Sequence, residues 1–132
     1  MRSIIFAAAL VALSPLAAQA QDAPAGNAEN GQRLFNQCRA CHTANEGGRN
    51  GVGPNLYRVY GRAAGSIEGF RYSAPMRAKA GEGLVWNEAN LRAYLADPKA
   101  VVPAGSMSFQ GFRDNAQNIS DVIAYLRQVG GQ

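Results

Sequence analysis

The sequence predicts an all-α fold in which three main helices are joined by long loops. Helix signals begin near Asn27, Asn87 and Asp114. The stretch 43–86 between the first two has no sustained period of 2 or 3.6, and nine of the fifteen glycines fall within it. A loop of this length is uncommon in a compact domain. We therefore expect it to wrap a large apolar object that replaces part of the missing core.

The first twenty residues have the pattern of a secretory signal peptide. Arg2 precedes an apolar run, and Ala18-Gln19-Ala20 supplies an A-x-A cleavage site. The apolar run is too short to span a bilayer. We expect export to the periplasm, with three segments: a signal peptide over 1–20, a flexible leader over 21–26 and one domain over 27–132.

The first two helices are each introduced by an asparagine. Asn27 can cap a helix whose apolar residues Leu34 and Phe35 come near its end. Asn87 can cap the second, which has an apolar stripe of Leu91, Tyr94 and Leu95. Pro98 is expected to end that helix, because the residue before a proline disfavours the helical conformation.

The last helix has the clearest pattern. Asp114, followed three residues later by Gln117, resembles a capping box, and Gly130 stands where the helix is expected to stop. One face carries an apolar stripe at helical spacing, formed by Ile119, Val122, Ile123, Leu126 and Val129.

Most of the reactive side-chain chemistry is concentrated in Cys38-Arg39-Ala40-Cys41-His42, which holds both cysteines and the only histidine. This C-x-x-C-H spacing indicates covalent attachment of a c-type haem. Cys38 and Cys41 lie on one face of a helical turn and can each form a thioether to the same haem. His42 is then a suitable axial ligand for the iron. The predicted cofactor is one haem c, the apolar object that the loops would wrap.

Three other interpretations of the motif remain open on the sequence alone. Cys38 and Cys41 could form a structural disulfide in an exported chain, or a thioredoxin-like redox pair. Neither needs the adjacent histidine, and no βαβ pattern surrounds the motif. A structural zinc site requires four ligands, whereas Cys and His supply three.

A sixth ligand to the iron is best supplied by a methionine, because no other His or Cys remains. Met1 leaves with the signal peptide, so the two choices are Met76 and Met107. Either could instead be a flexible gap-filler in the core. Met107 follows Pro103-Ala104-Gly105 in a stretch without helical period, which could lie against the opposite face of the ring.

The composition excludes some classes of function. The full chain has a net charge of +4, and removing Arg2 with the signal leaves 12 basic against 9 acidic residues, or about +3. Such a charge can steer acidic partners. No dense basic stretch accompanies it, so nucleic-acid binding is not expected. No later segment resembles a membrane span.

Several motifs in one order resemble class I cytochrome c, the small bacterial and mitochondrial type. They are Cys38 to His42, Gly53-Pro54-Asn55-Leu56, Gly61-Arg62, Gly69-Phe70-Arg71-Tyr72, Trp86 and Pro103 to Phe109. The resemblance covers 27–128 and implies the cytochrome c fold around one covalent haem.

The resemblance also implies roles around the haem. Met107 would be the sixth ligand, so that His42 and Met107 hold the metal. The carbonyl of Pro54 would accept the N–H of His42. Donors to the haem propionates would be Arg62, Tyr72 and Trp86. Tyr94 would lie with its hydroxyl near the Met107 sulfur.

The resemblance further implies a close crossing of the terminal helices, formed by Gly31, Phe35, Val122 and Tyr125. Two positions depart from the family pattern. Met76 stands where many relatives have asparagine, and Gly105 where they often have a hydroxyl residue. Met76 is left as a competitor for the iron, and the segment between Tyr72 and Trp86 is about three residues longer than in the mitochondrial type.

The expected function is a monomeric periplasmic electron carrier and not an enzyme. It would pass one electron at a time from a quinol-oxidising complex or dehydrogenase to a terminal oxidase, reductase or reaction centre. Docking would be transient, through a small interface, with rim charges from Arg39, Arg49, Lys79 and Lys99. The alternatives are a small-ligand sensor or peroxidase with a labile Met107, and a dedicated subunit of one larger enzyme.

Overall fold

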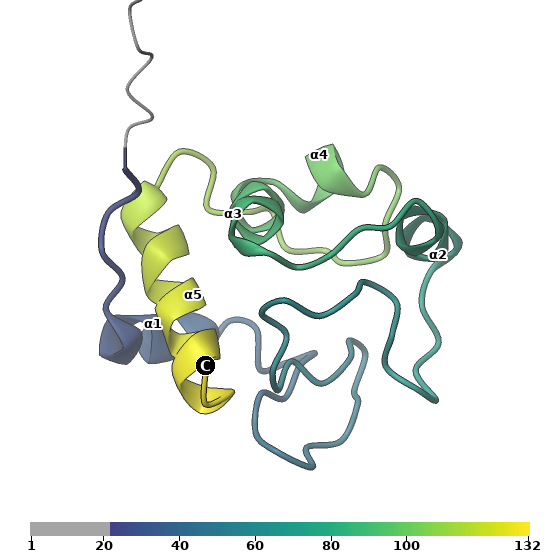
Figure 1. Ribbon diagram of the computed structural model, residues 1–132, viewed down its shortest axis with the longest axis horizontal. Helices are drawn as coiled ribbons and strands as arrows, with labels where there is room; N and C mark the ends of the chain where they lie inside the picture. The colour runs from purple at the N-terminus through teal and green to yellow at the C-terminus, as the bar shows by residue number, and fades with distance from the viewer. Residues whose placement is uncertain (1–21) are drawn as a thin grey trace, which may run out of the picture.

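The two terminal helices cross and pack against each other, although they lie at opposite ends of the sequence. The computed structural model describes residues 22–132, so the predicted signal peptide lies outside the described residues. Helix α1 spans Ala28–Phe35 and helix α5 spans Ala116–Val129. Figure 1 shows them on one side of the molecule, with the loops and the other helices on the other side.

The described residues contain three further helices and no strand. Helix α2 spans Ala74–Gly81, α3 spans Glu88–Ala96 and α4 spans Pro98–Val101. Helix α3 packs against α4 and α5, whereas α2 packs against no other helix of residues 22–132. This arrangement confirms the predicted all-α fold with long loops.

The structure differs from the predicted elements at two helix starts. The side chain that caps α5 belongs to Asn115, which accepts the N–H of Asn118, and not to Asp114. Pro98 does end α3, but it also begins the short helix α4, where its missing N–H costs nothing. The apolar stripe of α5 is correctly predicted, since Val122 and Ile123 are buried.

Helix α2 interrupts the stretch that the sequence presents as irregular. Ser73 caps it by accepting the N–H of Met76, and Pro75 stands in its first turn. The helix buries none of its residues fully, and only Met76 and Ala80 pack against the core. It therefore lacks the apolar periodicity by which a helix is identified in a sequence.

The crossing of α1 and α5 depends on a glycine and on a buried carboxylate. A Cβ on Gly31 would lie 1.9 Å from the Asp121 carbonyl oxygen, so only glycine permits this approach. The Asp121 side chain is 1% exposed. It accepts hydrogen bonds from the backbone N–H of Asn27 at 2.7 Å and from the side chains of Asn30 at 2.6 Å and Gln117 at 2.8 Å.

These bonds determine how Asp121 ionises. Burial alone would raise the pKa of the carboxyl, but the hydrogen bonds from Asn30, Asn27 and Gln117 outweigh burial and hold the pKa below its usual range. The carboxylate form is therefore the one that joins the two terminal helices.

Replacing Asp121 with asparagine should lower the free energy of unfolding at neutral pH by about 2 kcal/mol, because charged hydrogen bonds are lost. The folded-state pKa lies below the unfolded value of about 3.9. The contribution is therefore present above that value and is lost as the pH falls through the folded-state pKa. Urea unfolding at about pH 7 and about pH 3 should show the difference from wild type shrinking at the lower pH.

Asp114→Asn is the matched control, since Asp114 is an exposed carboxylate next to the same helix. It should show little difference from wild type at either pH. A difference for Asp121→Asn that is as large in acid as at neutral pH would contradict the prediction.

Candidate functional site

A cavity of about 320 Å³ opens between the loops and helices, within the size range of small-molecule and cofactor sites. All nine residues predicted to form the site line this cavity. Two of them, His42 and Pro54, also form a hydrogen bond with each other. The nine lie between positions 38 and 107 of the chain: Cys38, Cys41, His42, Pro54, Arg62, Tyr72, Trp86, Tyr94 and Met107.

The Cys-x-x-Cys-His segment follows directly after α1, in a continued helical turn. The N–H groups of Cys41 and His42 both donate to the carbonyl of Cys38, at 3.1 and 2.9 Å. This turn brings both sulfurs and the imidazole to one cavity wall. Burial, together with the neighbouring Cys41, raises the pKa of the Cys38 thiol to about 11.

This environment does not suit the other interpretations of the motif. A thiol with a raised pKa is a poor redox nucleophile, because the thiolate is the reactive form. Cys38 and Cys41 are both free thiols. Among residues 22–132, no three His, Cys, Asp or Glu side chains converge on a point where a metal ion could bind. Two free cysteines at one apolar wall fit thioether attachment of haem.

His42 is held by a backbone carbonyl and by a glycine. Its Nδ1 lies 2.7 Å from the Pro54 oxygen, and a carbonyl can only accept, so Nδ1 carries the proton. A Cβ on Gly53 would lie 2.3 Å from the His42 Cε1, which means that the ring packs directly on this glycine. Nε2 is thereby left as the lone-pair donor.

The surroundings of His42 keep it neutral. Burial lowers the pKa of the imidazole, and although the Pro54 hydrogen bond acts in the opposite direction, the positive charge of Arg62 lowers the pKa further. A neutral imidazole is the form that binds iron. Burial and nearby charge therefore favour the neutral imidazole, the form that a metal ligand requires.

Met107 lines the same cavity, and its sulfur has a hydrogen-bond donor. The Tyr94 hydroxyl donates to the Met107 Sδ at 3.4 Å. Burial raises the pKa of Tyr94 to about 12, so the hydroxyl keeps its proton and remains a donor. The Tyr94 ring packs against Trp86 with the centroids 4.8 Å apart.

The segment that carries Met107 is tied to α4. Lys99 donates from Nζ to the carbonyl of Gly105. Ala104 has a φ of 60°, a left-handed conformation that a non-glycine residue seldom adopts. Gly105 itself lines the cavity.

The predicted propionate donors lie around the cavity, and two of them already have partners in the protein. Arg62 donates to the carbonyls of Tyr57 and Asn55, each at 3.1 Å. The Tyr72 hydroxyl accepts the N–H of Ile67 at 3.0 Å. A bridge between Ala63 and Val85 holds the neighbouring backbone of Arg62 and Trp86 together.

Met76 also lines this cavity, from helix α2. The structure therefore places two thioethers at the site. Only Met107 receives a hydrogen bond at its sulfur from a described residue.

Sequence reasoning did not identify Asn55 as a functional residue, although it is buried and bonded to much of the surrounding loop. Asparagine after proline is typical of a turn, and nothing in the sequence alone shows that the amide faces inward.

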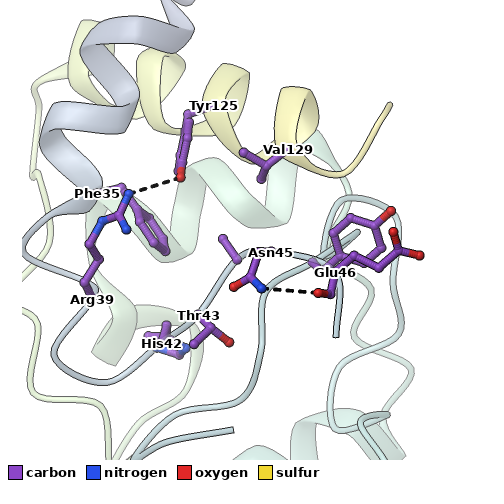
Figure 2. A pocket seen from close by; sticks show the side chains of 10 residues that line it. Phe35, Arg39, His42, Thr43, Asn45, Glu46, Tyr125 and Val129 are labelled. Atoms are coloured by element: carbon purple, nitrogen blue, oxygen red, sulfur yellow. Dashed lines mark hydrogen bonds between the residues drawn. The ribbon is translucent and has the colours of Figure 1, made fainter. Parts of the chain in front are cut away.

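A second cavity, of about 480 Å³, is lined by residues of both terminal helices and of the loop over 43–57. Figure 2 shows Arg39 and Tyr125 pointing toward each other on one side of it, with the Arg39 Nη2 3.5 Å from the Tyr125 hydroxyl. Phe35 and His42 line both cavities.

Comparison with known proteins agrees with this site. A family model described as "Cytochrome c" matches residues 28–130. "Cytochrome c2" of Blastochloris viridis is 41% identical over 128 residues, which cover 97% of this chain and 94% of that protein. "Cytochrome c2 iso-2" of Magnetospirillum molischianum is 47% identical over 108 residues, 82% of this chain and 98% of that protein.

A third relative extends the comparison. "Cytochrome c-550" of Nitrobacter winogradskyi is 39% identical over 103 residues, which cover 78% of this chain and 91% of that protein. The C-x-x-C-H segment, the apolar cavity and the crossed terminal helices all agree with the family match. The chain therefore belongs to the cytochrome c family.

Proposed function

We propose that this chain is a periplasmic electron carrier whose covalent haem c has His42 and Met107 as axial ligands. The observation that carries the proposal is that Cys38, Cys41, His42 and Met107 line one cavity. Similarity to proteins named cytochrome c2 supports a carrier and not an enzyme. When bound, the haem supplies an iron that gains and loses one electron.

Two other residues of the chain would hold the proposed ligands in place. Pro54 orients the His42 ring through Nδ1, and Tyr94 directs a hydroxyl proton to the Met107 sulfur. Ligands that stay in place in both oxidation states allow rapid transfer without rearrangement. A Tyr94 hydroxyl that holds the sulfur favours a carrier over a sensor or peroxidase, which would need a labile ligand.

The proposed donors are a quinol-oxidising complex or a dehydrogenase, and the proposed acceptors are a terminal oxidase, a reductase or a reaction centre. Export would follow cleavage after residue 20, leaving a leader over 21–26 and a monomeric domain over 27–132. No helix of residues 22–132 has the length and apolar character that crossing a membrane requires.

Purified holoprotein tests the proposal. It should titrate reversibly with one electron, show the methionine-to-iron absorption band when oxidised, and be reduced and reoxidised by membranes that contain the proposed complexes. An oxidised spectrum that lacks this band at neutral pH would count against Met107 ligation and in favour of an open site.

Salt should slow electron transfer with an acidic partner. The basic excess of the chain attracts such a partner over long range, and ions screen this attraction with a length of about 8 Å at physiological ionic strength. The rate constant for reduction by an acidic partner should fall as sodium chloride is added. Reduction by an uncharged small molecule is the control, and its rate should not change with salt. If the rate with the acidic partner were also unchanged by salt, electrostatic steering of that partner would be contradicted.

The rim charges should contribute unequally. Lys79 is paired with Glu82 at 2.9 Å, which offsets its charge. Arg39 and Arg49 are exposed, and neither forms an ion pair with a described residue. Their charges are therefore better placed to act on a partner.

A further inference from the structure

The Pro54 carbonyl belongs to a loop over 43–57, and the side chain of Asn55 holds this loop in shape. Asn55 is 9% exposed. Its Nδ2 donates to the Thr43 Oγ1 at 2.6 Å and to the Asn45 carbonyl at 3.0 Å, and its Oδ1 accepts the N–H of Tyr57 at 2.8 Å. One side chain therefore joins both ends of the loop.

The backbone of Asn55 fixes the direction of the Pro54 carbonyl. The Pro54 C=O and the Asn55 N–H belong to the same planar peptide unit. The Asn55 N–H donates to the Asn50 Oδ1 at 2.8 Å, while the Pro54 oxygen lies 2.7 Å from the His42 Nδ1. The Asn55 carbonyl accepts from Arg62 at 3.1 Å. Bonds on both sides thus hold this peptide plane against the imidazole.

The second cavity borders the loop where these bonds are made. The second cavity is lined by Thr43, Asn45 and Tyr57, which are the residues that the Asn55 side chain bonds. Figure 2 shows Thr43 and Asn45 at this cavity. On this side the loop borders a cavity and not closely packed atoms, so its shape depends on the Asn55 hydrogen bonds.

We propose that Asn55 is a positioning residue that sets the strength of the His42–Pro54 hydrogen bond and thereby the reduction potential. This inference deepens the proposed function and rests on it. A strong bond from Nδ1–H to a carbonyl increases the basicity of the imidazole, which stabilises the oxidised iron more than the reduced iron. Weakening that bond should therefore raise the potential.

Asn55→Ala in the holoprotein tests the proposal with two measurements. The His42 Nδ1 proton should exchange with solvent about tenfold faster by NMR, the factor that corresponds to the net free energy of one hydrogen bond. The reduction potential should rise. An unchanged or lower potential, in a protein that retains haem and His42 ligation, would overturn the proposal.

A milder variant covers the case in which Asn55→Ala does not fold. Thr43→Val removes the hydroxyl that accepts from Asn55 and keeps the shape of the side chain, whereas Thr43→Ser retains the hydroxyl. Thr43→Val should shift exchange and potential in the same direction by a smaller amount, and Thr43→Ser should restore both. Equal values for the two variants would overturn the proposal.

Ile123→Val is the control for a purely structural effect. It creates a small cavity in α5 at a residue that is 3% exposed and lines neither of the two cavities. It should lower stability and leave the potential unchanged, and a shift equal to that of Asn55→Ala would overturn the positioning role. A wild-type protein without haem or His42 ligation would instead refute the proposed function itself.

Discussion

Met107→Ala should leave the haem covalently attached and lower the reduction potential by on the order of 0.1 V, within the range of about 0.8 V over which axial ligands act. Cys38 and Cys41 are untouched, so attachment persists. Loss of the thioether would remove the proposed ligand, which favours reduced iron. The Tyr94 hydroxyl loses its acceptor at the same time. The vacated position should bind added imidazole or carbon monoxide.

The second methionine of the cavity provides the matched control. Met76→Leu conserves volume and apolar character at the other thioether that lines the site. It should retain the methionine-to-iron absorption band and resist added ligands. Potentiometric titration of Met107→Ala and Met76→Leu gives their reduction potentials, and optical spectra show whether each retains the methionine-to-iron band. An unchanged potential in Met107→Ala, or loss of the band in Met76→Leu, would contradict the assignment of Met107.

Local patterns in the sequence predicted the three main helices, because each has a cap or a stripe that the fold uses. Asn27 and Asn87 cap α1 and α3 as expected. Helix α5 shows its apolar stripe through Val122 and Ile123, both buried against the rest of the core. Such helices can be predicted from the sequence because their buried residues recur with the 3.6-residue period of a helix.

Helix α2 could not be predicted in this way. It packs on the core only through Met76 and Ala80, and a cap such as Ser73 is common in turns as well. The cap of α5 was wrong by one residue for a related reason. Asp114 and Asn115 are both good caps. The side chain of Gln117, the expected partner of Asp114, instead donates to the distant Ala25 carbonyl and to Asp121 within α5.

The sequence motif predicted the haem-attachment residues, whereas residues that act through long-range hydrogen bonds could not be predicted. The spacing of Cys38, Cys41 and His42 indicates haem by itself, because few other chemistries need all three. The role of Asn55 requires knowledge of which groups surround it, since its bonds reach residues up to 12 positions away. The same holds for Asp121, whose partner Asn27 lies 94 positions away.

Gly31→Ala should destabilise the protein by about 2–3 kcal/mol, although alanine is the better helix former by up to about 1 kcal/mol. The added Cβ would lie 1.9 Å from the Asp121 carbonyl oxygen and 2.8 Å from the Tyr125 Cβ. The backbone of Asp121 cannot move aside as the end of a flexible side chain can, so the two helices α1 and α5 must move apart. Their separation would also disturb Phe35, whose ring lies 5.2 Å from that of Tyr125 and lines the haem cavity.

Gly81→Ala makes the same change at a helical glycine where nothing lies within 4 Å of the new Cβ. Helix propensity then acts alone, and the free energy of unfolding should stay the same or rise by about 0.5–1 kcal/mol. Urea and thermal unfolding of both holoproteins measure the contrast. Equal stability of Gly31→Ala and Gly81→Ala would contradict the prediction. It would mean that the added methyl group meets no backbone at position 31, and therefore that α1 and α5 do not cross as closely as described.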